Sequence, residues 1–235
     1  MCGRFAQPRS AEELARIFRA RPAAELAGNQ FNVAPTDEVA AVVEHHGERV
    51  VDAFRWGLVP FYATTAKHAA RLINARAETA ETSPAFRTAF ERHRCIVPAD
   101  AFYEWRRHRD PATGRVVRSE PFAVRRDDGE PLALAGLWST WRDPASARRL
   151  YTCTILTTDP NRLVARIHDR MPVILDPADW DAWLAQATPR HELRALLRPA
   201  PEESLAAYAV SPAVNNVRSE GPELLAPLTR WSDGL

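Results

Sequence analysis

The cysteine at position two could perform the most unusual chemistry in this sequence. The chain opens with Met1, Cys2 and Gly3. Removal of Met1 would leave Cys2 with a free α-amine beside its thiol, so that one residue would carry two nucleophiles. An unperturbed α-amine has a pKa of about 8 and a thiol one of about 8.5, so both keep a reactive fraction at neutral pH. Such a pair can close a thiazolidine ring on an aldehyde, or the thiol alone can attack a carbonyl with the amine as its base. The alternative is that Cys2 is simply an early residue.

Two ionisable side chains stand alone among apolar residues further along the chain. Glu104 lies among aromatic residues in the segment 99–105, ADAFYEW. Burial there would raise the pKa of Glu104 and suit the carboxyl to general acid or base catalysis. His168 lies in the segment 167–172, IHDRMP, where an imidazole could move protons near neutral pH and the neighbouring Arg170 could hold a phosphate. An exposed glutamate on a half-buried strand and a structural histidine are the alternative interpretations.

Two more segments combine polar or aromatic side chains with apolar ones. Asn74 and Arg76 lie two residues apart in LINARAE, residues 72–78, as they would at a strand end facing a cleft, or in a surface turn. Residues 54–62, FRWGLVPFY, place aromatic side chains around a glycine and a proline. Aromatic side chains on such a loop can stack on nucleobases. A tryptophan-rich corner of the core is the alternative.

Composition bounds the class of protein. The 235 residues carry 31 basic and 30 acidic side chains, so no overall charge predicts a polyanion-binding protein. Lys67 is the only lysine. Arginine, alanine and proline are all abundant, which indicates a composition bias of the whole chain, so the number of arginines is weak evidence for phosphate binding. The three cysteines have no metal-ligand spacing, and no apolar run is long enough to span a membrane. We therefore expect a reduced, cytoplasmic protein with no metal and no cofactor.

The pattern of short elements predicts an α+β fold in which antiparallel strands carry peripheral helices. Ser10 and Glu13 have the spacing of a capping box, which begins a helix reaching residue 19. A hairpin is expected at 39–56, with its turn at 45–48, and an exposed hairpin tip at 106–120. Other strands are expected at 2–7, 95–98, 121–125, 132–138, 151–157 and 171–175, and other helices at 84–93, 178–187 and 190–197. Nothing divides the chain, so we expect one domain over 1–235, with its core at about 2–227 and a short C-terminal tail that is packed or frayed.

Seven blocks in order carry a family resemblance. They are MCGRF, NVAPT, WGLVP, LINARAET, CIVPADAFYEW, HDRMP and AVSPAVNNV, which run from residue 2 to about residue 227. The chain resembles the SRAP family, the SOS response-associated peptidases, whose members shield abasic sites in single-stranded DNA by a covalent crosslink. The resemblance implies antiparallel sheets forming a barrel-like core.

The resemblance also implies a mechanism. Cys2 becomes N-terminal after Met1 removal, its amine forms a Schiff base with the aldehyde of a ring-opened abasic site, and its thiol closes a thiazolidine. The family's asparagine falls on Asn74, which would orient the sugar. Its glutamate falls on Glu104, which would shuttle protons, and its histidine falls on His168, which would help to open the sugar and to reverse the link.

DNA contacts are implied in the same way. The family's phosphate-binding arginines match Arg4, Arg76 and Arg170. Pro35 and the loop with Trp56 and Tyr62 are expected to pack against bases, and little sequence preference follows. The family carries tryptophan two residues after the proline of WGLVP, whereas this chain has Tyr62. Tyrosine covers less area in a stack, which puts the stacking partner or the affinity in question.

The word peptidase in the family name describes, on this interpretation, self-removal of Met1 or release of a crosslink. The expected partner is single-stranded DNA containing abasic sites, bound by a monomer that joins the nucleoid when DNA is damaged. Two other classes stay open. Glutamine amidotransferases also begin Met-Cys-Gly, so Cys2 could attack a glutamine amide, although the substrate-clamp blocks of that family are absent. The second class is a protein that binds single-stranded DNA without a covalent bond and in which Cys2 has no special role.

Overall fold

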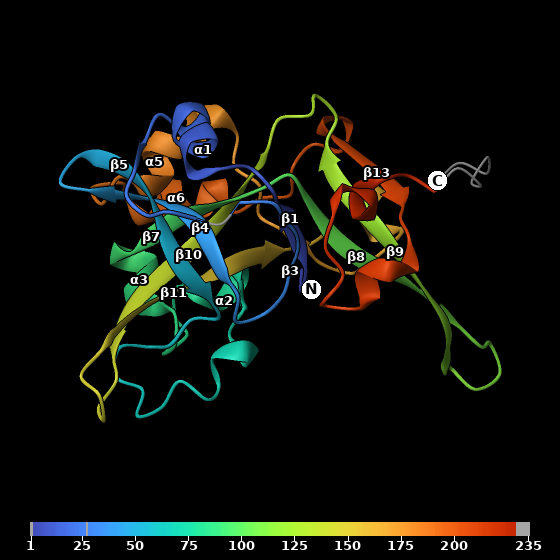
Figure 1. Cartoon of the computed structure of the whole chain (residues 1–235), viewed down its shortest axis with the longest axis horizontal. Coiled ribbons are helices and arrows are strands. Elements are labelled where there is room, and N and C mark those ends of the chain that lie inside the picture. The colour runs from blue at the N-terminus through green and yellow to red at the C-terminus, as the bar shows by residue number, and fades with distance from the viewer. Residues whose placement is uncertain (1, 27, 229–235) are drawn as a thin grey trace.

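Two β-sheets meet near the N-terminal end of the chain in the computed structural model, which describes residues 2–26 and 28–228 (Figure 1). The larger sheet contains β2 (Arg21–Pro22), β4 (Glu38–His45), β5 (Glu48–Trp56), β7 (Arg94–Ala99), β10 (Leu132–Arg142), β11 (Arg149–Thr158) and β12 (Met171–Pro172), with β6 (Asn74–Arg76) paired to β11. The smaller sheet contains β1 (Phe5–Gln7), β3 (Gln30–Val33), β8 (Ala101–Arg109), β9 (Val116–Arg126) and β13 (Leu205–Ala209).

Short helices accompany the strands. The α-helices are α1 (Ala11–Phe18), α2 (Ala77–Ala80), α3 (Arg87–Arg92), α4 (Arg162–Ala165), α5 (Trp180–Leu184) and α6 (Arg190–Leu196). Single 3-10 turns are η1 (Ala69–Arg71), η2 (Pro177–Asp179), η3 (Glu202–Ser204), η4 (Pro212–Asn215) and η5 (Pro222–Leu225). No helix among residues 2–26 and 28–228 is long and apolar enough to cross a membrane.

Five strands of the larger sheet close into a barrel. β11, β10, β7, β4 and β5 are antiparallel neighbours in that order. β5 then returns to β11 through a parallel pairing of Arg55 with Thr152 and of Trp56 with Cys153. The α+β class predicted from the sequence pattern and the barrel-like core implied by the family resemblance are therefore confirmed.

Alternation along the barrel strands divides the core in two. On β4, Val39, Ala41 and Val43 belong to one buried cluster, and Ala40 and Val42 belong to another. The second cluster includes the apolar side chains of α1, α3, α5 and α6, so it forms the outer face of the barrel under its helices. The first cluster therefore fills the barrel and continues into the smaller sheet, as the two-residue period of a strand requires.

Local sequence signals correctly placed several elements. The Ser10 hydroxyl accepts from the Glu13 backbone N–H at 3.2 Å, and the Glu13 carboxylate accepts from the Ser10 N–H at 2.9 Å, so the capping box is confirmed. The hairpin of β4 and β5 turns where the sequence predicted. The predicted exposed tip at 106–120 is wrong in extent, because β8 continues to Arg109 and β9 begins at Val116.

Other element boundaries also need correction. The strand expected at 171–175 forms only the two-residue strand β12, followed by an isolated bridge between Ile174 and Leu134. The helix expected at 178–187 is split into η2 and α5. The helix expected at 84–93 is shorter at both ends. The strands β3 and β13 and the helices α2 and α4 were not predicted. Of the predicted C-terminal tail, residues 229–235 lie outside the described residues, while Leu225 before them accepts a hydrogen bond from the Tyr208 hydroxyl at 2.9 Å.

Candidate active site

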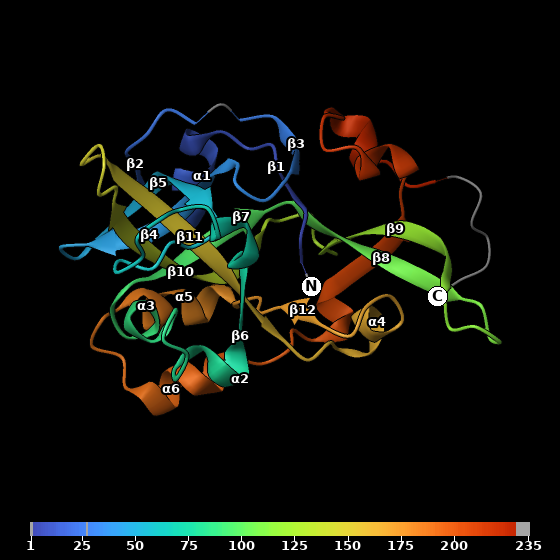
Figure 2. The ribbon, with the colours of Figure 1, turned by 90° about the horizontal axis from the view of Figure 1, so that it is seen from below.

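Four segments bring the predicted catalytic side chains together where the two sheets meet. Cys2 precedes β1, Asn74 begins β6, Glu104 lies on β8, and His168 follows α4. Asn74 Nδ2 donates to the Cys2 carbonyl oxygen at 2.7 Å, and His168 Nε2 lies 3.9 Å from Glu104 Oε2. Figure 2 shows the N-terminal end of the chain beside β8, with α4 and β12 on the same side. The structure therefore assembles the four residues that the sequence placed far apart.

Strand pairing fixes Cys2 and Asn74. Pairing of β1 with β8, including a 2.9 Å hydrogen bond from the Tyr103 N–H to the Arg4 carbonyl, runs the N-terminal segment alongside Glu104. β6 pairs in parallel with β11, with Asn74 opposite Ile155, directly beyond the point where β5 leaves β11. The pairing of β6 with β11, next to the point where β5 closes the barrel, therefore places Asn74 beside the Cys2 backbone.

Cys2 is completely buried. Burial raises the pKa of its thiol well above the usual value, and the nearby Glu104 carboxylate raises it further. The thiol is accordingly protonated at neutral pH, and a reaction through sulfur needs a base close by. Cys95 and Cys153 are also buried, with thiol pKa values raised by burial, in keeping with the expectation that they are inert.

Glu104 is a buried carboxyl, with its side chain 4% exposed. Burial raises its pKa, and the His168 imidazole opposes that shift. The sequence explained this burial by the aromatic residues around Glu104, and that explanation holds only for those that lie on the barrel side. Successive side chains of a strand point to opposite faces, so Tyr103 and Trp105 pack on the other face of β8, in a separate cluster. Glu104 is instead buried against the barrel side, where Phe102 joins the barrel core.

The tautomer of His168 follows from its backbone neighbour. His168 Nδ1 lies 3.1 Å from the Arg170 N–H, which requires Nδ1 to be an acceptor. A contact of 2.9 Å between Nδ1 and the exposed Asp169 carboxylate would require Nδ1 to carry a proton, so the two arrangements exclude each other. We assign the acceptor form, because the backbone N–H is fixed and Asp169 is solvated. The Nε2 proton then points to the side of Glu104.

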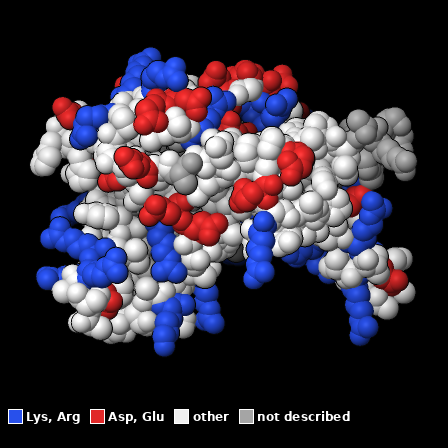
Figure 3. All heavy atoms as spheres, in the orientation of Figure 1, with Lys and Arg blue, Asp and Glu red and all other residues white. Residues whose placement is uncertain are grey.

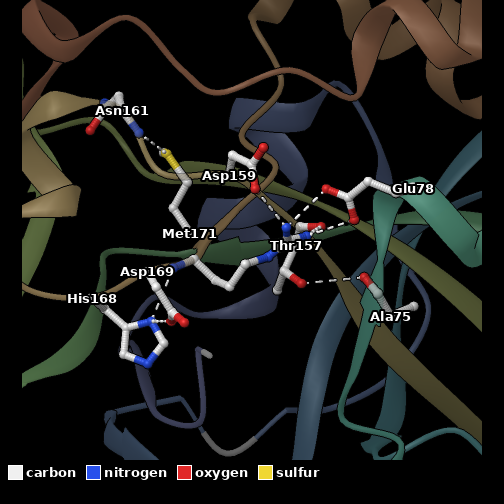
Figure 4. Close-up of polar contacts among 9 residues, drawn as sticks. Ala75, Glu78, Thr157, Asp159, Asn161, His168, Asp169 and Met171 are labelled. Atoms are coloured by element: carbon white, nitrogen blue, oxygen red, sulfur yellow. Dashed lines mark hydrogen bonds and ion pairs between the residues drawn. The ribbon is translucent and has the colours of Figure 1, made fainter.

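Arg170 joins the histidine segment to Glu78, Thr157 and Asp159, which are labelled in Figure 4. Its guanidinium forms two 2.9 Å bonds with Glu78, one of 2.9 Å with Asp159 and one of 2.7 Å with the Thr157 carbonyl. The paired guanidinium in turn lowers the pKa of Glu78. Sequence analysis missed Glu78 and Asp159. Glu78 belongs to the LINARAET block, and that membership was the available signal.

The expected phosphate-binding arginines differ in accessibility. Arg4 is half-buried, and its Nη1 donates to Asn32 Oδ1 at 2.8 Å and to the Val214 carbonyl at 2.9 Å. Arg170 is held as described above, whereas Arg76 is exposed on β6. Pro35 is half-buried. Among the three arginines, Arg76 presents its side chain most openly.

The aromatic residues of the WGLVPFY loop separate into a core member and a surface pair. Trp56 is completely buried, its indole packs edge-on against Phe5 at 4.9 Å, and its Nε1 donates to the Ile73 carbonyl at 3.0 Å. Trp56 is therefore a core residue, which corrects the expectation that it packs against a base. Tyr62 is 55% exposed and contacts Phe61, which is 62% exposed and which sequence analysis left out of the site.

The described residues contain no cluster of three or more histidine, cysteine or acidic side chains that could hold a metal ion. The chemistry available at this site is that of a nucleophile beside a buried carboxyl, an imidazole and a carboxamide. Such a set can add a nucleophile to a carbonyl and move the protons that the addition releases.

Comparison with known proteins identifies relatives of the chain. Residues 1–217 match the model of the family described as SOS response associated peptidase (SRAP). The abasic site processing protein YoqW of Bacillus subtilis is 38% identical over 96% of this chain and 99% of its own. The abasic site processing protein YedK of Escherichia coli is 30% identical over 97% of this chain and 100% of its own.

Solved structures share the fold. A protein from Bacteroides thetaiotaomicron superposes with a TM-score of 0.86 at 24% identity, covering 97% of this chain and 100% of its own. A protein from Bordetella bronchiseptica gives 0.72 at 30% identity, covering 89% and 100%. The chain therefore belongs to the SOS response associated peptidase (SRAP) family.

Proposed function

We propose that this protein captures abasic sites in single-stranded DNA by forming a thiazolidine through Cys2 once Met1 has been removed. The observation that carries the proposal is the assembly of Cys2, Asn74, Glu104 and His168 at one point, together with relatives named for abasic site processing. A ring-opened abasic site presents an aldehyde, and an N-terminal cysteine presents the two nucleophiles that can close a ring on it.

The reaction loses one water molecule. The α-amine of Cys2 adds to the aldehyde carbon and gives a carbinolamine, which loses its hydroxyl as water and becomes an imine. The thiol then adds across the imine: sulfur bonds to carbon, and the thiol proton passes to nitrogen. An imine alone hydrolyses readily, so the closed ring makes the link long-lived.

Each partner has a defined task in this sequence. Protonated Glu104, whose raised pKa keeps a proton on the carboxyl to higher pH, gives a proton to the departing hydroxyl, and its carboxylate then receives one. His168 assists opening of the sugar and, by microscopic reversibility, reversal of the link. Asn74 fixes the Cys2 backbone through Nδ2, and its buried Oδ1 is available to accept from a sugar hydroxyl.

DNA contacts complete the proposal. Arg76 and Tyr62 are exposed and suit a phosphate and a base face respectively. Arg4, Arg170 and Pro35 are half-buried and are the other DNA contacts of this proposal. The Met1 bond is cleaved by the protein itself in this proposal, so the peptidase activity acts on its own N-terminus.

The test mixes purified protein, its N-terminus defined by mass spectrometry, with single-stranded DNA that carries one abasic site. The expected product is a heat-stable protein–DNA band that disappears with Cys2→Ala and with a retained Met1. Cys153→Ala is the matched control, because it removes a buried thiol elsewhere and should leave the band intact. If a protein with free Cys2 gives no band, the crosslinking proposal is wrong. Release of ammonia from glutamine would then support the amidohydrolase alternative.

A further inference from the structure

The hairpin of β8 and β9 carries a row of basic side chains on the same face as Glu104. Side chains alternate along a strand, so Arg106 and His108 follow Glu104 on one face of β8. The register pairs Arg106 with Glu120 and His108 with Arg118, which puts the β9 residues on that face as well. Figure 1 shows this hairpin projecting beyond the smaller sheet, and Figure 3 shows basic side chains on the projection at the lower right.

One buried carboxylate organises the row. Glu120, with its side chain 8% exposed, accepts from Arg106 Nε at 3.2 Å and from Arg106 Nη2 at 2.9 Å. It also contacts His108 Nε2 at 2.7 Å and Arg118 Nη2. The Arg106 guanidinium lies 4.8 Å from the centre of the Phe122 ring. Among the described residues, two guanidinium groups therefore share this one carboxylate, which sets two positive charges against one negative charge.

The positive charge of the cluster is directed to solvent. The Arg118 side chain is 62% exposed and that of His108 is 39% exposed. Residues 106–118 contain five arginines against one aspartate, in a protein whose net charge is +1. On the opposite face of β8, Trp105 Nε1 donates to Asn215 Oδ1 at 2.7 Å, so that face is packed against the C-terminal segment. The exposed basic side chains thus lie on the same face of β8 as Glu104.

We propose that Arg106, His108 and Arg118 form a track for the backbone phosphates of the DNA strand on one side of the captured lesion. Alternate residues of a strand are spaced by about 6.6 Å, so the row extends outward in steps from the catalytic carboxyl. Arginine forms bidentate, charge-assisted bonds with phosphate oxygens. Glu120 holds the guanidinium groups in place before DNA arrives, which reduces the ordering cost of binding. This inference rests on the proposed function, because it assigns the strand that flanks the lesion.

The test measures equilibrium affinity for single strands that carry a tetrahydrofuran abasic analogue, which has no aldehyde and cannot be crosslinked. One oligonucleotide has a long flank on the 5′ side of the analogue only, and the other has it on the 3′ side only. Arg118→Ala should weaken binding about five- to tenfold for one of the two and leave the other unchanged. The slope of log K against log salt should fall by about 0.7 for that oligonucleotide, as expected for one lost phosphate contact with a single strand.

Arg107→Ala is the matched control, because Arg107 is exposed on the same strand and faces the opposite side. It removes the same charge and should not change either affinity. Glu120→Gln should weaken the same flank as Arg118→Ala, and melting temperatures establish that each variant is folded. The proposed phosphate track is wrong if Arg118→Ala and Arg107→Ala lose the same affinity. It is also wrong if Arg118→Ala weakens binding of both oligonucleotides equally or of neither.

Failure of the track and failure of the proposed function give different results. If wild-type protein forms the Cys2-dependent crosslink while Arg118→Ala binds both oligonucleotides normally, only the track is wrong. If no crosslink forms while Arg118→Ala still loses affinity for one flank, the track stands and the covalent chemistry is wrong.

Discussion

The guanidinium of Arg170 forms two 2.9 Å hydrogen bonds with the carboxylate of Glu78 and so joins the segment of His168 to the helix that follows Asn74. Because the Arg170 N–H also donates to His168 Nδ1, the same residue sets the position and the tautomer of the imidazole. Arg170 is thus a positioning residue in this structure, and its phosphate contact remains a proposal.

Replacement of Glu78 tests this assignment. Glu78→Gln removes one charge from the pair and should lower the crosslinking rate about tenfold, because small displacements of reacting groups are costly. Affinity for intact single-stranded DNA should stay the same. If Arg170 were mainly a phosphate ligand, freeing it from Glu78 would raise that affinity. Glu81→Gln is the control, because Glu81 pairs with Arg194 on the surface near α6.

Replacement of Glu104 tests how much a buried carboxyl destabilises the folded state. A raised pKa means that the folded state holds the Glu104 proton more tightly than the unfolded chain does. The proton of Glu104 therefore stabilises the folded state at a pH below 4.5, the usual pKa of a glutamate. This stabilisation is lost as the pH rises through the pKa of Glu104 in the folded state. Glu104→Gln should melt at a higher temperature than wild type at pH 7, by roughly 2–4 °C per kcal/mol recovered. The difference should vanish near pH 4 in scanning calorimetry.

The same substitution should change the pH dependence of crosslinking. Formation of the imine needs an unprotonated amine and a protonated acid, so the wild-type rate should follow a bell-shaped curve. Glu104→Gln should lower the maximum about 100-fold and leave only the limb that reports the amine. An unchanged curve in this variant would show that Glu104 is not the proton donor.

Replacement of Asn74 tests the link to the Cys2 backbone. Asn74→Ala removes the donor to the Cys2 carbonyl and should slow crosslinking about 10- to 100-fold, as expected when a buried acceptor loses its partner. Asn74→Asp keeps the size but turns an acceptor toward that carbonyl, so it should be at least as slow. Rates come from quenched time courses at saturating DNA. Wild-type rates in both variants would remove Asn74 from the mechanism.

The two aromatic environments of the WGLVPFY loop should respond differently to truncation. Tyr62→Ala should weaken binding of single-stranded DNA about 5- to 150-fold, since a stacked base contributes about 1–3 kcal/mol, and should leave the melting temperature unchanged. Trp56→Ala should destabilise the fold by about 3–5 kcal/mol, because it empties a core position. Tyr62→Trp should bind more tightly because the ring covers more area. Tyr151→Ala, at an exposed tyrosine on β11, should leave the affinity unchanged.

Local signals carried much of the fold, and long-range contacts determined the rest. The capping box of Ser10 and Glu13 depends on neighbours in sequence, so it could be predicted. The outer part of β8, from Arg106 to Arg109, has no apolar alternation because both faces of the hairpin leave the core there, so the sequence predicted that the hairpin tip begins at 106. Composition could not distinguish buried Trp56 from exposed Tyr62, since both lie in one aromatic segment.

The sequence predicted which residues form the site better than it predicted the contacts between them. Motif resemblance named Cys2, Asn74, Glu104 and His168, which the fold brings together. The Arg170 contacts to Glu78 and Asp159 join residues from three segments, and no local pattern encodes such a pairing.

The barrel closes through a short seam. β5 meets β11 through two residue pairs, and the Gly57 N–H adds a 2.8 Å bond to the Cys153 carbonyl, whereas β4 and β5 pair along eight positions. Gly57 has a φ of 126°, and a Cβ there would lie 2.7 Å from the Ala69 carbonyl oxygen, so glycine is needed for the chain to turn away. Local opening should require the least free energy at such a seam, and the Gly57 amide should exchange with solvent early. Asn74 lies opposite Ile155, two residues beyond Cys153 on β11, so we expect opening of the seam to weaken its bond to the Cys2 carbonyl. The lifetime of the closed barrel should then limit the lifetime of that contact.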